Sequence, residues 1–250
     1  MKIIKTILKV LLGIIVLLVA AFFILKAIYS KDLPQGVKGP EAEQLAQKML
    51  TAINHVAFDT IPYVKWSFRG EHHYVFDKTN NTSRISWGEN EVHLKMDEVN
   101  GRAFENGSEV KDSDTADKLV KTAWGYWCND SFWFNAPSKV FDNGTERSVV
   151  TNEDGSKSLM VTYISGGVTP GDSYLWHLDD DGLPNCYQMW TKIIPIGGVS
   201  ASWENWVELP NGAKISSFHN IGGKMPLDIG DIKGGFTWNE LGFDSNPIQL

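Results

Sequence analysis

The first thirty residues constrain this chain most. Three lysines within the first nine positions precede an unbroken apolar run at residues 10–25; Lys26 interrupts the run, and three further residues extend it to Tyr29. As a helix, the twenty residues 10–29 would be about 30 Å long, which matches the hydrocarbon core of a bilayer. Lys26 can reach the headgroups, and Tyr29 suits the interface. We therefore expect residues 1–29 to be a membrane anchor.

The charges around this segment predict its orientation. The positive-inside rule keeps the short basic N-terminus in the cytoplasm, and Lys31 and Lys38 beyond the run weaken this asymmetry without reversing it. We expect a single-pass helix in the cytoplasmic membrane, N-terminus inside, with the rest of the chain in the periplasm or another extracytoplasmic space. The alternative is a signal peptide cleaved near Val19-Ala20-Ala21, but the apolar run continues past that point. A lipoprotein is not expected, because the first cysteine is Cys128.

Composition excludes some classes of function. The net charge is −7 and no basic face is visible, so we expect no binding of nucleic acid. Cys128 and Cys186 follow no zinc-type spacing; they are either a disulfide or two unrelated small hydrophobic residues. Ten tryptophans are spread along the chain after the anchor, where they either fill a β core or line an aromatic cleft.

Two amphipathic helices are expected after a polar linker at residues 30–39. The first begins with Pro40 and carries apolar residues at helical spacing as far as Ala57. The second covers residues 113–127, with Ser113 or Asp114 as its N-cap. We find no boundary within residues 40–250 and expect a single domain there.

The rest of the chain indicates antiparallel strands. Val64, Trp66 and Phe68 alternate with polar residues, and similar short runs follow as far as Met96. Three hairpins are predicted by Asp-Gly or Asn-Gly at their tips, with turns at residues 152–155, 179–182 and 210–212. Without βαβ alternation, the pattern predicts an α+β fold: a strongly curved antiparallel sheet, or half-barrel, of about nine to eleven strands packed on the two helices.

Some strands are apolar on both faces. In residues 159–164 and 174–178 neither face is polar, which indicates that both are covered. The helix pair is the expected cover of one face, and the interior of the curved sheet that of the other. The glycine pairs Gly166-Gly167 and Gly197-Gly198 open no helix and fit bends in such a sheet better than a phosphate cradle.

Signals for catalysis or metal binding are weak. His72 and His73 point to opposite faces of a strand, and the other histidines are isolated, so we expect no metal site. Residues 179–182 lack the further ligands of a calcium loop and read as a hairpin turn. No G-x-S-x-G elbow is present, and no cofactor is expected. Asn129-Asp130-Ser131, placed after the second helix, either carries catalytic groups or satisfies backbone groups where helix gives way to strand.

Two stretches resemble a known family. They are Asn129-Asp130-Ser131-Phe132-Trp133-Phe134-Asn135-Ala136-Pro137, leading to Thr145, and Val168-Thr169-Pro170-Gly171-Asp172-Ser173-Tyr174-Leu175-Trp176-His177-Leu178-Asp179, running to Trp190. They resemble uncharacterised bacterial envelope proteins of the outer-membrane lipoprotein carrier (LolA/LolB-like) superfamily, in which an aromatic strand ending in proline precedes a strand opening with Thr-Pro-Gly-Asp. The resemblance implies an incomplete barrel, plugged by helices, whose concave face binds acyl chains or another apolar ligand.

We therefore predict a membrane-tethered binding protein that holds a lipid, a lipoprotein acyl chain or another hydrophobic ligand in a dry hollow of the half-barrel. The predicted lining residues are aromatic or large and apolar: Trp66, Phe68, Trp87, Leu94, Met96, Trp133, Tyr174 and Trp176. The same residues would otherwise simply fill a closed core. No protein partner is indicated.

The sequence leaves the question of an enzyme open, although it favours a binding protein. The alternative is a hydrolase of envelope glycans or lipids with carboxylates in a tryptophan-lined cleft. The groups considered for it are Asp130, Asp172, His177 and Glu204. An assembly scaffold with an exposed aromatic edge is a third possibility.

Overall fold

The structure is a computed structural model that describes residues 2–165 and 170–250. The glycine pair Gly166-Gly167 and the opening Val168-Thr169 of the second family-like stretch lie outside the described residues.

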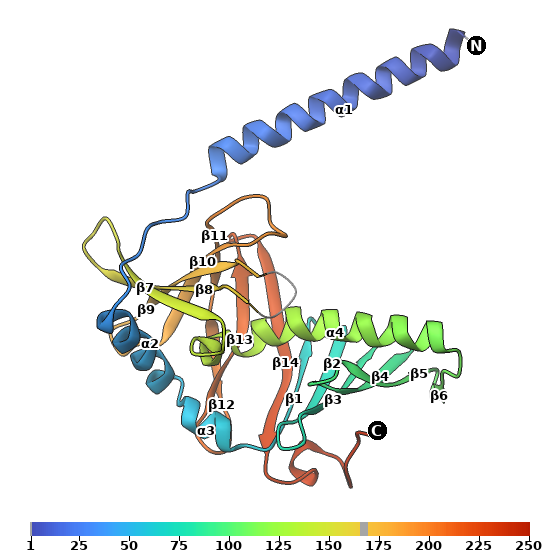
Figure 1. Ribbon diagram of the computed structural model, residues 1–250, viewed down its shortest axis with the longest axis vertical. Coiled ribbons are helices and arrows are strands. Elements are labelled where there is room, and N and C mark those ends of the chain that lie inside the picture. The colour runs from blue at the N-terminus through green and yellow to red at the C-terminus, as the bar shows by residue number, and fades with distance from the viewer. Residues whose placement is uncertain (1, 166–169) are drawn as a thin grey trace.

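Helix α1 (Lys2–Tyr29) projects away from the rest of the molecule (Figure 1). Its segment Lys9–Tyr29, of 21 residues, is long and apolar enough to cross a membrane. The most apolar part of this segment is not buried against the domain. The helix expected from the apolar run is therefore present, and its apolar side chains have no protein surface to cover them.

The remainder is α+β, built on one large antiparallel sheet. The described strands are β1 (Tyr63–Phe68), β2 (His72–Asp77), β3 (Thr82–Trp87), β4 (Asn90–Lys95), β5 (Asn100–Glu105), β6 (Ser108–Glu109), β7 (Thr145–Thr151), β8 (Lys157–Tyr163), β9 (Ser173–Leu178), β10 (Pro184–Trp190), β11 (Val199–Ser202), β12 (Glu204–Glu208), β13 (Lys214–Ile221) and β14 (Met225–Gly235). Their order is β6-β5-β4-β3-β2-β1-β14-β13-β11-β10-β9-β8-β7, with β12 paired to β13. Because β6 and β7 lie at opposite ends of this order, the sheet is open.

Fourteen strands exceed the nine to eleven expected. The additional ones have weak apolar patterns: β5 buries only Ala103, and β14 contains Pro226 and three glycines. β14 nevertheless has a central place, because it pairs with β1 from Tyr63↔Gly235 to Phe68↔Ile229 and so joins the two halves of the sheet. The three predicted hairpins are confirmed as β7–β8, β9–β10 and β12–β13.

The expectation of two amphipathic helices is not confirmed. The first splits into α2 (Pro40–Ala52) and α3 (His55–Thr60), because Asn54 between them takes the left-handed conformation at φ 53°. Asparagine tolerates this conformation better than most residues, and it interrupts the helical hydrogen bonds. Two short 3₁₀ helices, η1 (Ala136–Lys139) and η2 (Asn239–Leu241), complete the helical elements described.

The second helix, α4 (Ser113–Asn135), is longer than expected. Asp112, one residue before the expected caps, is its N-cap and accepts a hydrogen bond from the backbone N–H of Thr115 at 2.9 Å. At the other end the helix includes residues 129–135, which the family resemblance placed in a strand. These residues are helical because Trp133 and Phe134 are both buried in the core from the last turns of α4.

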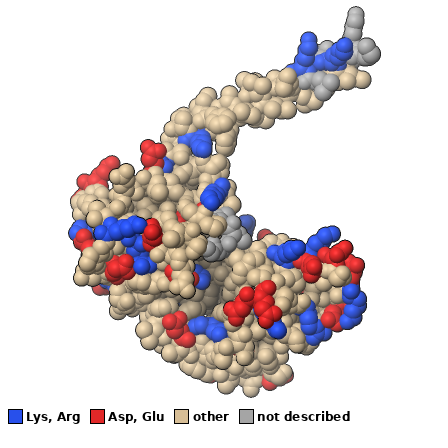
Figure 2. Space-filling view, in the orientation of Figure 1, with Lys and Arg blue, Asp and Glu red and all other residues tan. Residues whose placement is uncertain are grey.

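Helix α4 lies across one face of the sheet, against β5, β4, β3 and β13, while α2 packs on β7 and β8 (Figure 1). The main hydrophobic core fills the space between these helices and the sheet. Space-filling atoms show a hollow between two lobes, on the side where α1 leaves the domain (Figure 2).

The opposite face of β7–β10 is covered differently from our expectation. Val150, Met160 and Leu175 form a small second cluster there, with Trp190 beside it. Both ends of the expected polar linker lie against this side of the sheet, because Trp190 is hydrogen-bonded to Lys31 and Gly36 lies close to the Ser148 side chain. We call residues 30–37 the strap; it lies where the interior of a curved sheet was expected.

The strap is held at both ends. Near β10, the Lys31 N–H donates to the carbonyl of Gly197 at 2.9 Å, and near β7, Val37 and Val149 exchange two backbone hydrogen bonds at 2.8 and 2.9 Å. Three strand spacings of about 4.8 Å, or about 14 Å in all, separate β10 from β7, and the six steps from Lys31 to Val37 can span about 20 Å when extended. The segment is therefore long enough to cross these strands.

Candidate functional site: an aromatic pocket under helix α4

A pocket of about 320 Å³ opens between α4 and the β1–β4 part of the sheet. Ligand pockets in proteins measure about 300–1,000 Å³, so this one is at the small end of the range. Its apolar lining is largely aromatic and consists of Phe58, Val64, Trp66, Phe76, Met96, Trp124, Trp127 and Phe134. Such a lining suits a flat or linear apolar group.

Helix periodicity brings the α4 side chains to the pocket. Trp124, Trp127, Ser131 and Phe134 follow one another at spacings of three or four residues, which places them along one face of the helix. That face meets β1 and β2, which supply Trp66 and Phe76. The pocket thus combines one helical stripe with side chains from two neighbouring strands.

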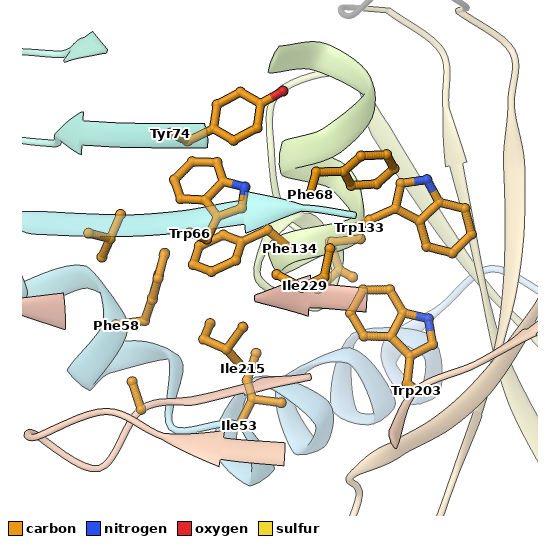
Figure 3. Packing of buried hydrophobic residues seen from close by; sticks show 14 of the residues in the cluster. Ile53, Phe58, Trp66, Phe68, Tyr74, Trp133, Phe134, Trp203, Ile215 and Ile229 are labelled. Carbon is orange, nitrogen blue, oxygen red and sulfur yellow. The ribbon is translucent and has the colours of Figure 1, made fainter. Parts of the chain in front are cut away.

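Ring contacts hold the aromatic wall together. Trp66 is stacked between Tyr74 and Phe134, with ring centroids 4.7 and 4.3 Å away (Figure 3). Trp127 contacts the edge of Phe76 at 4.8 Å and tilts against Trp66 at 5.3 Å. Aromatic pairs of this kind add about 0.5–1.5 kcal/mol each to the area that they bury. The wall is therefore well ordered without a ligand.

A buried carboxylate holds α4 against β2. Asp130, only 1 % exposed, accepts hydrogen bonds from the Tyr74 hydroxyl at 2.5 Å and the Asn129 amide at 2.7 Å, and its other contact is His72 Nδ1 at 2.7 Å. Burial, together with this carboxylate, raises the pKa of Tyr74 far above its ordinary value, so the phenol stays a donor. The network sets the position of Ser131, the next residue, which lines the pocket.

Polar side chains complete the lining. Asn81 donates to Asp97 at 2.5 Å, and Lys139 forms an ion pair with Asp142 at 3.2 Å. Asp97 is exposed and Lys139 partly exposed. On the aromatic side Phe58, Trp66 and Phe134 are buried, and Phe76, Trp124 and Trp127 are half-buried. The other polar residues that line the pocket are Ser131 and Asn135. A ligand with an apolar body and a polar end would match both parts.

A second aromatic group fills the β9–β13 side of the core. Trp133, Tyr187, Trp203 and His219 are in ring contact at 4.4–5.9 Å. His219 lies between the carbonyl oxygens of Ser202 (2.9 Å) and Trp133 (3.0 Å). Burial lowers the pKa of His219 to about 4, although the two carbonyls oppose this shift. The imidazole is therefore neutral at pH 7.

The structure divides the eight predicted lining residues between these regions. Trp66 and Met96 line the pocket. Phe68 and Leu94 are buried in the same core without lining it, and Trp87 is half-buried with its edge against Tyr126 at 5.4 Å. The remaining three belong to the second aromatic group or lie beside it: Trp133, Tyr174 and Trp176. Their role in binding remains a prediction.

The predicted set lacked the α4 side of the pocket. The helix predicted over residues 113–127 includes Trp124 and Trp127, but it ends before Ser131 and Phe134. Continued through Ser131 and Phe134, the same spacing would have marked one lining face from end to end. Phe76 falls within the short alternating runs predicted between Phe68 and Met96, and only its proximity to α4 makes it a lining residue.

The residues of the hydrolase alternative are not gathered here. Among the described residues, Asp97 is the carboxylate that lines the pocket. Asp130 is occupied by Tyr74 and His72, and Glu204 is exposed on β12. Asp172 accepts the backbone N–H of Lys192 at 3.0 Å.

His177, the last of that set, lies on the strap side of β9. Its Nδ1 is 2.8 Å from the Ser158 hydroxyl, and burial lowers its pKa. Cys128 and Cys186 are both free thiols. Burial raises the pKa of Cys128 to about 11 and that of Cys186 as well, so neither is activated as a nucleophile.

The chain matches no family profile and no curated protein. Among solved structures, a domain from Vibrio parahaemolyticus titled an outer membrane lipoprotein-sorting protein aligns over 78 % of this chain and 99 % of its own, with 7 % identity and a TM-score of 0.30. At that TM-score the likeness supports neither a shared fold nor a shared function.

Proposed function

We propose that this protein is a membrane-anchored, extracytoplasmic binding protein that holds a lipid, a lipoprotein acyl chain or another hydrophobic ligand under α4. Residues 1–29 would be the single-pass anchor, N-terminus inside, and residues 40–250 one ligand-binding domain. The observation that carries the proposal is the pocket of about 320 Å³, aromatic on its buried side and polar towards solvent.

The size of the pocket predicts a loose, exchangeable complex. Each buried methylene contributes about 0.8 kcal/mol, so six of them would contribute about 5 kcal/mol, which corresponds to a Kd between about 1 mM and 0.1 mM. A ligand whose chain enters only partly would be held with this affinity and released readily. Such behaviour suits a protein that presents or transfers an apolar group.

Photolabelling tests the proposal. The full-length protein in phosphatidylcholine nanodiscs is incubated with a palmitate analogue that carries a diazirine on its chain, then irradiated, digested and mapped by mass spectrometry. We expect labelled peptides from residues 124–135 and 64–76. Ser131→Trp fills the pocket from α4 and Met96→Trp from the sheet, and each is expected to reduce this labelling at least fivefold.

Thr122→Trp is the matched control, because Thr122 is exposed on the same helix and the same side chain is introduced. Thermal unfolding followed by circular dichroism shows whether each variant is folded. Labelling that is equal in the wild type and in both filled variants would contradict the proposal. Labels confined to residues 10–29 would do the same, since they would place the probe in the bilayer.

A further inference from the structure

A second pocket, of about 480 Å³, lies where α1 meets the domain. It is formed by the last turn of α1, the start of the strap and the connection between β10 and β11. The side chains that give it its character are Lys26, Lys31, Trp190, Lys192 and Ile194. It shares no lining residue with the aromatic pocket under α4.

The pocket is a built feature, because hydrogen bonds join the start of the strap to β10 and to the β10–β11 connection. Trp190 Nε1 donates to the carbonyl of Lys31 at 2.8 Å, and the Gly197 N–H donates to the Ser30 hydroxyl at 2.9 Å. A Cβ at position 197 would lie 2.6 Å from Trp190 Cδ1 and 2.7 Å from the Lys31 carbonyl oxygen. Only glycine permits this close packing, which holds Ser30 and Lys31, just beyond α1, on the domain.

The charge of the pocket is positive. Lys26, Lys31 and Lys192 line it, against the single carboxylate of Asp32. Lys192 extends over Gly171, where an added Cβ would lie 3.5 Å from its Cε, and its backbone N–H donates to Asp172. Basic side chains are visible where α1 joins the domain (Figure 2).

An apolar side chain stands beside these lysines. Ile193 is 68 % exposed, next to the half-buried Ile194 and Trp190. Trp190 lies just beyond the apolar span, which ends at Tyr29, because its Nε1 is hydrogen-bonded to the carbonyl of Lys31. Lysine, tryptophan and exposed isoleucine at the end of a membrane helix match the layers of a bilayer surface, where phosphates lie just above the acyl chains.

We infer that this pocket binds the phosphate headgroup of an anionic phospholipid in the leaflet from which α1 emerges, with Ile193 in contact with the acyl region. The inference rests on the proposed membrane anchoring of α1. The bound headgroup orients the domain, so that the hollow between its lobes faces the bilayer side from which α1 extends (Figure 2).

Native mass spectrometry of the full chain in detergent tests the inference. Phosphatidylglycerol and phosphatidylcholine of the same chain length are added separately, and the fraction of protein that retains one lipid is measured. We expect about tenfold stronger retention of phosphatidylglycerol by the wild type. Lys31→Gln together with Lys192→Gln is expected to weaken this retention about 10- to 30-fold, since each lysine near anionic lipid contributes about fivefold.

The control is Lys118→Gln together with Lys121→Gln, which makes the same charge change at exposed sites on α4 and is expected to behave as the wild type. Equal retention by the two double variants would overturn the inference, as would equal retention of the two lipids by the wild type. Displacement of phosphatidylglycerol by millimolar inorganic phosphate would also overturn it, in favour of a site for a free anion.

The outcome is distinguishable from that of the ligand pocket. Photolabelling under α4 is expected to be unchanged by the Lys31 and Lys192 substitutions. Loss of the lipid preference with intact labelling therefore refutes only the headgroup site. Absence of labelling under α4 with an intact lipid preference refutes only the hydrophobic-ligand pocket.

Discussion

Buried polar residues connect parts of the chain that are far apart in the sequence. Asp130 joins α4 to β2 through Tyr74 and His72, and losing one partner of such a buried charged group costs about 3–5 kcal/mol. His219 joins β13 to the end of α4 through the carbonyl of Trp133. Asp130 thereby positions Tyr74, and His219 positions Trp133, although neither Asp130 nor His219 lines the pocket.

His219 predicts acid sensitivity. Its pKa of about 4 in the folded state is below its value of about 6.5 in the unfolded chain, so the unfolded chain binds more protons between these values. Its contribution to stability is complete above pH 6.5 and is lost as the pH falls towards 4, by up to about 1.4 kcal/mol per pH unit. We expect the free energy of unfolding in urea to be about 1–2 kcal/mol lower at pH 5 than at pH 7.

His219→Gln should reduce this difference, although the variant will be less stable at pH 7. His73→Gln, at an exposed position on β2, should leave the difference unchanged. Part of the difference in unfolding free energy between pH 5 and pH 7 remains in His219→Gln, because burial also lowers the pKa of His177. An unaltered pH dependence in His219→Gln would show that this imidazole is not the responsible group.

At the scale of elements, the strap determines how the helix α1 is connected to the domain. A free ten-residue linker would let the domain move away from the membrane, whereas the docked strap holds α1 against the β10–β11 connection. Its passage across β7 requires a small residue, because a Cβ at Gly36 would overlap the Ser148 hydroxyl.

Gly36→Val is therefore expected to release the strap. Limited trypsin digestion of the full chain reports this, since Lys31 and Lys38 flank the crossing. We expect cleavage at these lysines to become at least fivefold faster, while the thermal midpoint of the domain changes little. Gln35→Val, at the exposed neighbouring position, should be cleaved at the wild-type rate. Equal rates for the two variants would mean that the strap does not depend on the close approach of Gly36.

At the scale of the whole molecule, α1 and the sheet are the two parts whose relation matters. The exposed apolar surface of α1 is continuous over Lys9–Tyr29, and such a surface is stable only in a membrane or against another protein. The strap places the domain directly at the end of that helix, so the position of one part determines that of the other.

The proposed topology can be measured in bacterial cells that express the full chain. We expect the protein to stay in the membrane fraction after carbonate extraction, with an intact mass close to 27.9 kDa, which separates an uncleaved anchor from a processed signal peptide. Alkaline phosphatase fused after Leu250 should be active, and the same enzyme fused after Lys9 inactive. Release by carbonate, or the reverse pattern of activity, would contradict the assigned orientation.

Local patterns in the sequence were sufficient for several features. The apolar run predicted α1, the Asp-Gly and Asn-Gly tips predicted three hairpins, and the period of two predicted an antiparallel sheet. These features depend on neighbouring residues, because turn chemistry and the alternation of side chains act over a few positions. The predicted lining set reached the pocket only at Trp66 and Met96, since a strand pattern shows which face is apolar but not what that face meets.

Tertiary structure alone decided the rest. Tyr63 pairs with Gly235, Phe76 meets Trp127, and Lys31 bonds to Gly197, although each pair is far apart in the chain. Tertiary structure also decided that the end of α4 is helical, because burial of Trp133 and Phe134 against other elements favours helix where the local signal was ambiguous. Local sequence determined which elements form, whereas the pocket and the docked strap exist only because packing brings these distant segments into contact.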